Sequence, residues 1–120
     1  MKLIEFFFQL SNVIKLYHWR TDSYARHKAS DTLFGKIIEI SDKFMEVYFG
    51  KYGKTSIKSL QYTSELLDDK QIVDYLNLCI TLLNDLVKNK VIKSTDTDLL
   101  NLRDELLAEI NQTLYLFTFE

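Results

Sequence analysis

The chain contains no proline and only three glycines, at positions 35, 50 and 53. Proline and glycine mark turns and interrupt helices, so a chain with so few of them has few turns and long regular elements. Its apolar residues recur at the three- and four-residue spacing of amphipathic helices. The sequence therefore predicts an all-α fold.

Four segments show this helical spacing. Clusters of Ser, Thr and Asp at residues 21–23 and 94–96 supply helix starts, and Gly50 and Gly53 supply a helix end. The predicted helices run from about Leu3 to Arg20, from Ser23 to Phe49, from Thr63 or Ser64 to Lys90, and from just after Asp96 to Phe117.

The connections between these helices predict their order in space. The first and second helices, and the third and fourth, are joined by a few residues and should form antiparallel hairpins. The segment Gly50–Tyr62 is longer and spans roughly 40 Å when extended, which is about the length of a long helix. We therefore expect one domain over residues 1–120, a four-helix bundle in the ferritin-like order with a crossover between helices two and three. The alternative is a loose loop with a short helix around Ile57–Leu60.

Charge and hydropathy argue against several classes of protein. The net charge of −2 predicts no strong binding to nucleic acid. No run reaches the ~18 apolar residues of a membrane span, and the first ten residues lack the uninterrupted apolar core and cleavage site of a secretion signal. The single cysteine, Cys79, cannot form an intrachain disulfide. We expect a cytoplasmic protein, or one of the host cytoplasm if the chain is viral.

Two features of the sequence concern the surface of the predicted bundle. Apolar residues around Phe6–Phe8, Tyr75–Leu82 and Leu114–Phe119 are too many for one small core and predict a homo-oligomer, at least a dimer. Around the end of the second helix lies a mildly basic stretch, which suits a nucleotide or a phosphate but is more often a solvated face. Its members are Lys36, Lys43, Lys51, Lys54 and Lys58.

The residues with the clearest chemical potential are in the first half of the chain. The two histidines, His18 and His27, flank the first hairpin turn, so an antiparallel hairpin brings their imidazoles together. Asp42 and Glu46 are four residues apart and share one face of the second helix. Imidazole with carboxylate is the ligand mix of non-haem iron, and zinc and manganese accept it too.

One ion cannot join all four side chains within one chain. His27 and Asp42 are fifteen residues apart on one helix, about 22 Å along its axis, but they have nearly the same helical phase. Two copies whose second helices pack antiparallel around a two-fold axis would set the histidines of one copy against the carboxylates of the other. That arrangement predicts two equivalent sites between subunits.

Residues 17–19 (Tyr-His-Trp), His27, Asp42 and Glu46 resemble the ferroxidase motif of the Dps mini-ferritins. The resemblance covers about residues 10–50 and implies a shell-forming oligomer that oxidises iron(II) with peroxide or oxygen. His18 and His27 of one chain and Asp42 and Glu46 of another would be metal ligands, with Trp19 a nearby electron donor. The histidines are closer together than in that family by about a helical turn, and a basic tail is missing.

Other interpretations stay open for the same residues. The phrase Ser23–Ala29 also resembles a family of small virus-encoded proteins, which suggests a non-catalytic helical oligomer that binds a host protein or sequesters a small ligand. In that case both histidines are ordinary residues beside a turn, Asp42 and Glu46 are a solvated face, and Trp19 is a packing residue. Asp22 and Asp31 are either partners that orient the histidines or a cap and a surface charge.

Overall fold

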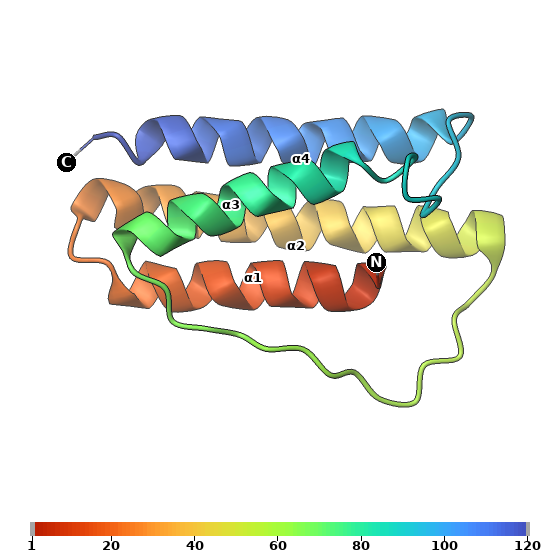
Figure 1. Ribbon diagram of the computed structural model, residues 1–120, viewed down its shortest axis with the longest axis horizontal. Coiled ribbons are helices and arrows are strands. Elements are labelled where there is room, and N and C mark those ends of the chain that lie inside the picture. Colours follow the sequence, from red (N-terminus) through yellow and green to blue (C-terminus); the bar gives the residue numbers. More distant parts are fainter. Residues whose placement is uncertain (1, 120) are drawn as a thin grey trace.

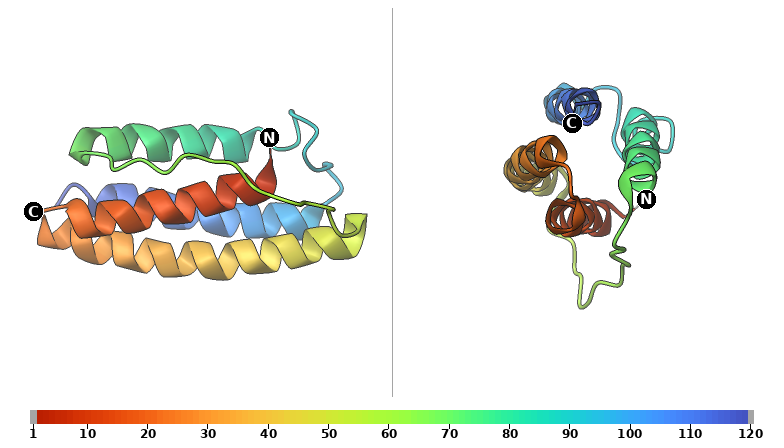
Figure 2. Two further views of the ribbon diagram at one scale, coloured as in Figure 1. Left: turned by 90° about the horizontal axis from the view of Figure 1, so that it is seen from below. Right: turned by 90° about the vertical axis from the view of Figure 1, so that its left-hand side faces the viewer.

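The computed structural model describes residues 2–119 and contains four α-helices that lie side by side as a bundle (Figure 1). Seen along the bundle, α2 lies next to both α1 and α4, and α3 completes the ring beside α4 (Figure 2). The all-α four-helix prediction is confirmed. The helices are α1 (Leu3–Arg20), α2 (Tyr24–Tyr52), α3 (Asp69–Asn84) and α4 (Thr97–Leu116).

The crossover between α2 and α3 is also confirmed. Residues 53–68 run without helix along the whole length of the bundle, so that α2 and α3 point the same way (Figure 1). The crossover is fastened to α1, because Gln9 Nε2 donates to the carbonyl oxygen of Thr63 at 2.8 Å and Asn12 Nδ2 donates to the hydroxyl of Tyr62 at 3.0 Å. The alternative short helix at residues 57–60 does not form.

The core lies between the four helices and is formed by the apolar stripe of each helix. The ring of Phe7 packs edge-on against Phe44, with centroids 5.4 Å apart. Of the three consecutive phenylalanines, Phe6 is buried with Phe7, whereas Phe8 points outward. The largest fully buried side chains are Leu10, Ile14, Tyr17, Leu33, Ile37, Phe44, Ile72, Leu76, Leu83, Leu86, Leu99 and Leu106.

The predicted start of the third helix was wrong by about five residues. The helix begins after Asp68, whose side chain accepts hydrogen bonds from the N–H groups of Lys70 and Gln71, while the Gln71 side chain accepts from the N–H of Asp68. This reciprocal capping box satisfies helix N–H groups that otherwise lack partners. Thr63 and its neighbours instead complete the crossover.

The third helix also ends earlier than the predicted Lys90. Regular helix stops at Asn84, and residues 85–90 continue as turns. Lys90 has a positive φ of 61°, its N–H donates to the Val87 carbonyl at 3.0 Å, and the N–H of Val91 donates to the Leu86 carbonyl at 2.9 Å. This is a Schellman closure with lysine at the position that glycine usually occupies.

Asp96 precedes α4 as predicted, but its side chain does not cap that helix. The buried carboxylate instead accepts hydrogen bonds from the Lys51 ammonium at 2.8 Å, from the Tyr52 hydroxyl and from the N–H of Lys93 at 2.8 Å. These bonds hold the pKa of Asp96 at about 2, with the Lys51 interaction as the largest cause. Asp96 therefore fastens the end of α2 to the start of α4.

None of the helices within residues 2–119 is both long and apolar enough to cross a membrane.

Candidate functional site at the hairpin end

The two histidines meet at the α1–α2 turn, as the sequence predicted. His18 lies in the last turn of α1 and His27 in the first turn of α2. Their rings stack with centroids 3.9 Å apart and an interplanar angle of 20°. His18 is buried and His27 is half-buried, so the pair is part of the packed end of the bundle.

Reciprocal hydrogen bonds fix both rings. Nδ1 of His18 lies 2.8 Å from the carbonyl oxygen of His27, and Nδ1 of His27 lies 3.0 Å from the carbonyl oxygen of His18. A carbonyl only accepts, so each Nδ1 carries the proton and donates. In the neutral form, each Nε2 is then the unprotonated nitrogen, which is the form that binds a metal.

The two rings are not aimed at one ion. Each Nε2 lone pair lies in the plane of its ring, and the planes are stacked and nearly parallel. The two lone pairs therefore do not converge at bonding distance, and one ring would have to turn for both to bind the same metal. Within residues 2–119, no three His, Cys, Asp or Glu side chains are grouped closely enough to hold one ion.

Among residues 2–119, Asp31 has a carboxylate close to this pair. Its Oδ1 lies 3.9 Å from His18 Nε2, which is too long for a hydrogen bond, and 3.9 Å from the Lys15 ammonium. Asp22 is exposed in the turn. Asp31, but not Asp22, is thus placed to interact with a charged His18.

Asp42 and Glu46 are far from the histidines of the same chain. They lie on the exposed face of α2, which continues unbroken from Tyr24 to Tyr52, so about 22 Å of helix still separates His27 from Asp42. The two carboxyl groups lie close to each other, and the hydrogen bond with Asp42 raises the pKa of Glu46. Their role as ligands to another copy stays a prediction.

Trp19 is not a packing residue. Its side chain is 68% exposed, and the Lys15 ammonium lies 5.6 Å from the centre of its ring. Across the turn, Tyr24 is 71% exposed, with the Lys28 ammonium 5.9 Å from its ring centre. Two large aromatic side chains therefore flank the hairpin turn and face solvent.

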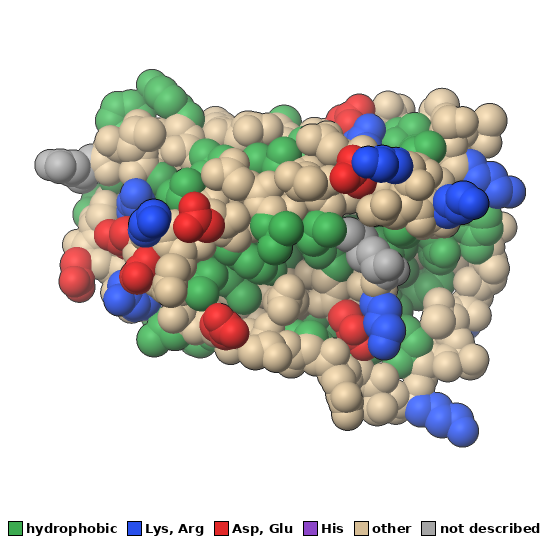
Figure 3. All heavy atoms as spheres, viewed as in Figure 1, with side chains coloured by type: hydrophobic (Ala, Val, Ile, Leu, Met, Phe, Trp, Pro, Cys, Tyr) green, Lys and Arg blue, Asp and Glu red, His purple; other side chains and the backbone are tan. Residues whose placement is uncertain are grey.

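The end of α4 adds two more exposed aromatic rings beside α2. Tyr115 and Phe119 pack edge-on with centroids 5.1 Å apart, and both are exposed. Figure 3 shows hydrophobic side chains at this end of α4, and a second group in the middle of the face near α3. We call the four exposed aromatic residues at this end of the bundle, Trp19, Tyr24, Tyr115 and Phe119, the aromatic surface.

A groove of about 310 Å³ lies between α2 and the end of α4, beside the aromatic surface. Small side chains of α2 leave this space open on one side, and Leu116 and Phe119 at the end of α4 form the other side. The groove is lined by Ala25, Lys28, Ala29, Thr32, Leu116 and Phe119.

Arg26 holds this end of the bundle together. Its guanidinium donates to the Tyr17 hydroxyl at 3.0 Å, to the Asp69 carbonyl at 2.9 Å and to the Phe117 carbonyl at 3.2 Å. Each acceptor belongs to a different part of the chain, so one side chain of α2 positions the ends of α1, α3 and α4. Burial raises the pKa of Tyr17, and so does the hydrogen bond that its hydroxyl donates to Asp69.

The sequence did not reveal the aromatic surface or the role of Arg26. Trp19 and Tyr24 are close in sequence, but Tyr115 and Phe119 are brought to the same end of the bundle only by the packing of α4 on α2. The available signals were two aromatic residues beside a short turn and an arginine in the first turn of a helix, and both patterns are common.

Comparison with known proteins finds one matching family and one phage relative. The profile of a family of unknown function, DUF5856, matches residues 18–117. The chain is 29% identical over 104 residues to the uncharacterized 14.6 kDa protein in the mobD-ri intergenic region of Enterobacteria phage T4, an alignment that covers 86% of this chain and 75% of that protein. No solved structure matches the chain.

These comparisons support the likeness to small virus-encoded proteins, and they do not support the mini-ferritin likeness. The matched region includes all four helices except the first fifteen residues of α1. The chain is a member of the DUF5856 family.

Proposed function

We propose that this protein is a non-catalytic helical module that binds a protein of the host cell through its aromatic surface. The observation that carries the proposal is the exposure of Trp19 and Tyr24 on both sides of one short turn, at the same end of the bundle as a groove that Phe119 lines. The phage relative supports a role inside an infected cell.

Aromatic side chains dominate the energetics of protein interfaces. Trp and Tyr are enriched among the residues whose truncation costs most binding energy, and they act best beside a pocket that takes a partner's anchor. Trp19 is 68% exposed and does not belong to the buried core, and the Lys15 ammonium lies 5.6 Å from its ring centre. The groove between α2 and α4 fits one apolar side chain of a partner.

The charges around the aromatic surface indicate the partner's chemistry. Arg20 and Lys28 are exposed beside it with one exposed carboxylate in the turn, Asp22, whereas Lys15 is already near Asp31. Exposed cations at the rim of an interface favour carboxylates on the partner and speed its association. The partner segment should therefore offer an apolar side chain flanked by Asp or Glu.

Site-specific photo-crosslinking tests the proposal. A photoreactive residue at Trp19 or Phe119, introduced into the full chain in host cells, should capture the same protein, and one at Leu78 should not. Leu78 is the matched control, because it is exposed and apolar but lies on α3.

The captured protein must then bind in purified form. Trp19→Ala and Phe119→Ala should each weaken its binding at least tenfold, while Leu78→Ala should leave it unchanged. Capture from all three positions alike, capture of a second copy of this chain, or equal affinity of the three variants would overturn the proposal.

Metal binding is the second candidate function, and the histidine tautomer favours it. Both Nε2 atoms lack a proton in the neutral pair, and Asp42 lies beside Glu46 with a raised Glu46 pKa, an arrangement that a cation would relieve. Imidazole and carboxylate suit iron, zinc or manganese. Iron would be the substrate of an oxidation at a site shared by two copies.

An anaerobic iron(II) titration followed by absorbance and native mass spectrometry tests this candidate. A shared site predicts two irons or two iron pairs per dimer and oxidation after peroxide is added. A chain that stays monomeric at micromolar concentration with iron(II) present would reject the shared site.

A further inference from the structure

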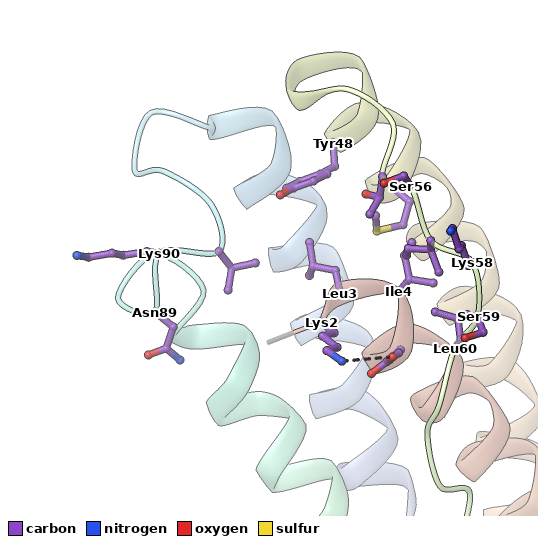
Figure 4. Close-up of a pocket in the computed structure, with 15 residues that line it drawn as sticks. Lys2, Leu3, Ile4, Tyr48, Ser56, Lys58, Ser59, Leu60, Asn89 and Lys90 are labelled. Carbon is purple, nitrogen blue, oxygen red and sulfur yellow. Dashed lines mark ion pairs between the residues drawn. The ribbon is translucent and has the colours of Figure 1, made fainter.

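A large cavity, drawn in Figure 4, lies at the opposite end of the bundle from the aromatic surface. It has a volume of about 750 Å³, is open to solvent on one side, and is lined by the start of α1, the end of α2, the first part of the crossover and the turn that follows α3. Pockets for small organic ligands have volumes of about 300–1,000 Å³, so this cavity is large enough for one.

One side of the cavity is apolar. Leu3 and Ile4 of α1 lie at its centre and Tyr48 lies above them (Figure 4). Met45 and Val91 are further apolar residues that line the cavity. Such a surface suits a flat or aliphatic group of a ligand.

The crossover forms the other side and is mixed. It contributes the hydroxyl residues Thr55, Ser56 and Ser59 and the basic residue Lys58, together with the apolar Ile57 and Leu60. Within residues 2–119, the four polar side chains make no hydrogen bond or ion pair with another side chain or the backbone. They are therefore free to donate to a ligand.

The charges at the cavity favour an anion. Lys2, Lys58 and Lys90 line it, and the one acidic lining residue within residues 2–119, Glu5, lies 3.9 Å from Lys2. Lys90 stands on the rim, with its side chain extended away from the cavity in Figure 4. The first turn of α1, which has no side-chain cap, adds backbone N–H groups to the same region.

In the structure, Lys58 has a different environment from the other lysines of the basic stretch. Lys51 is paired with Asp96 and Asp98, and Lys36 is near Glu39. Of that stretch, Lys58 is the member that reaches the cavity.

We propose that this cavity binds a small organic phosphate of the size of a nucleoside monophosphate. The apolar side takes the base or another flat group, and Lys58 with the hydroxyls of the crossover binds the phosphate, which lysine recognises as a point charge. Lys90 adds charge from the rim. The proposal goes beyond the protein-binding function and concerns the other end of the bundle, so either can fail alone.

Calorimetric titration of the full chain with AMP tests the proposal, with adenosine and inorganic phosphate as comparison ligands. AMP should bind saturably and at least tenfold more tightly than either, because only AMP carries both groups. The double variant Lys58→Gln/Lys90→Gln should weaken AMP binding at least fivefold. The matched control Lys36→Gln/Lys70→Gln removes the same charge from exposed lysines elsewhere and should leave the affinity unchanged.

Three results would overturn the proposal. One is the absence of saturable AMP binding at millimolar concentration. Another is phosphate binding as tight as AMP binding, which would indicate ionic attraction alone. The third is an equal loss of affinity in the two double variants, because the effect would then come from net charge and not from this cavity.

Discussion

His27 caps the end of α1 by donating from Nδ1 to the carbonyl oxygen of His18, and His18 returns a bond of the same kind to the carbonyl of His27. The carbonyl of His18 belongs to the last turn of α1, where helix carbonyls lack a partner within the helix. The pair therefore has a structural role that is independent of any metal.

Two substitutions of His27 test its structural role. His27→Ala leaves the His18 carbonyl without its donor and should lower the free energy of unfolding by about 1–2 kcal/mol. His27→Asn should be close to the wild type, because its amide nitrogen lies where Nδ1 lay and can donate the same bond. Urea denaturation followed by circular dichroism measures both. If Asn is as destabilising as Ala, the hydrogen bond is not what His27 contributes.

A mixture of two variants tests the shared metal site. His27→Ala and Asp42→Ala should each abolish both sites of a homodimer, because each site would use both residues from different chains. After random reassociation, half of the dimers are mixed and each has one intact site of two. Iron oxidation should therefore recover toward a quarter of the wild-type level. Full activity of either single variant would reject the ligand assignment, and mixed dimers without recovery would reject the sharing.

The lowered pKa of Asp96 predicts that the fold loses stability in acid. This pKa is lowered to about 2 in the folded chain, mainly by Lys51, and is about 3.9 in an unfolded chain. A lowered carboxylate pKa stabilises the fold above the unfolded value, and this contribution disappears as the pH falls from about 4 to about 2.

Asp96→Asn should therefore be less stable than the wild type at pH 7, and its stability should fall less between pH 4 and pH 2. Thermal unfolding at several pH values measures the difference. Asp98→Asn is the control, because Asp98 also pairs with Lys51 but is exposed, and its effect should be smaller. An unchanged acid profile for Asp96→Asn would contradict the assignment.

Lys90 has the left-handed backbone conformation that glycine adopts without strain. Lys90→Gly should raise the free energy of unfolding by about 0.5–1 kcal/mol. Lys88→Gly, two residues earlier and without a positive φ, should lower it by a similar amount, because glycine adds freedom to the unfolded chain. Equal effects of the two substitutions would mean that the conformation of Lys90 costs nothing.

Gly35 lies on the exposed side of α2, between His27 and Asp42, and an added methyl group would meet no atom within 4 Å. If this face of α2 is exposed to solvent, Gly35→Ala should stabilise the fold by about 0.5–1 kcal/mol. A seam between two α2 helices would place the new methyl inside the contact. Light scattering, combined with the unfolding measurement, distinguishes the cases: loss of a dimer in Gly35→Ala would locate the interface on this face.

The sequence alone determined the helices whose ends are set by local chemistry. The first helix was predicted at its observed ends, Leu3 and Arg20, and the cluster at residues 21–23 was correctly identified as the start signal of the second. The second helix ends at Tyr52, three residues after its predicted end. The crossover followed from the length of the segment after Gly50. The meeting of His18 and His27 followed from one short turn. These features depend on residues that are neighbours along the chain.

Tertiary structure decided the features that need distant residues. Thr63 is in extended chain because its carbonyl is bound by Gln9 of α1, and Asp96 faces Lys51 and Tyr52 instead of capping its own helix. The aromatic surface and the large cavity each combine segments more than forty residues apart. Local patterns record the preferences of a residue within a turn or two, whereas these contacts exist only after packing has fixed which helix lies beside which.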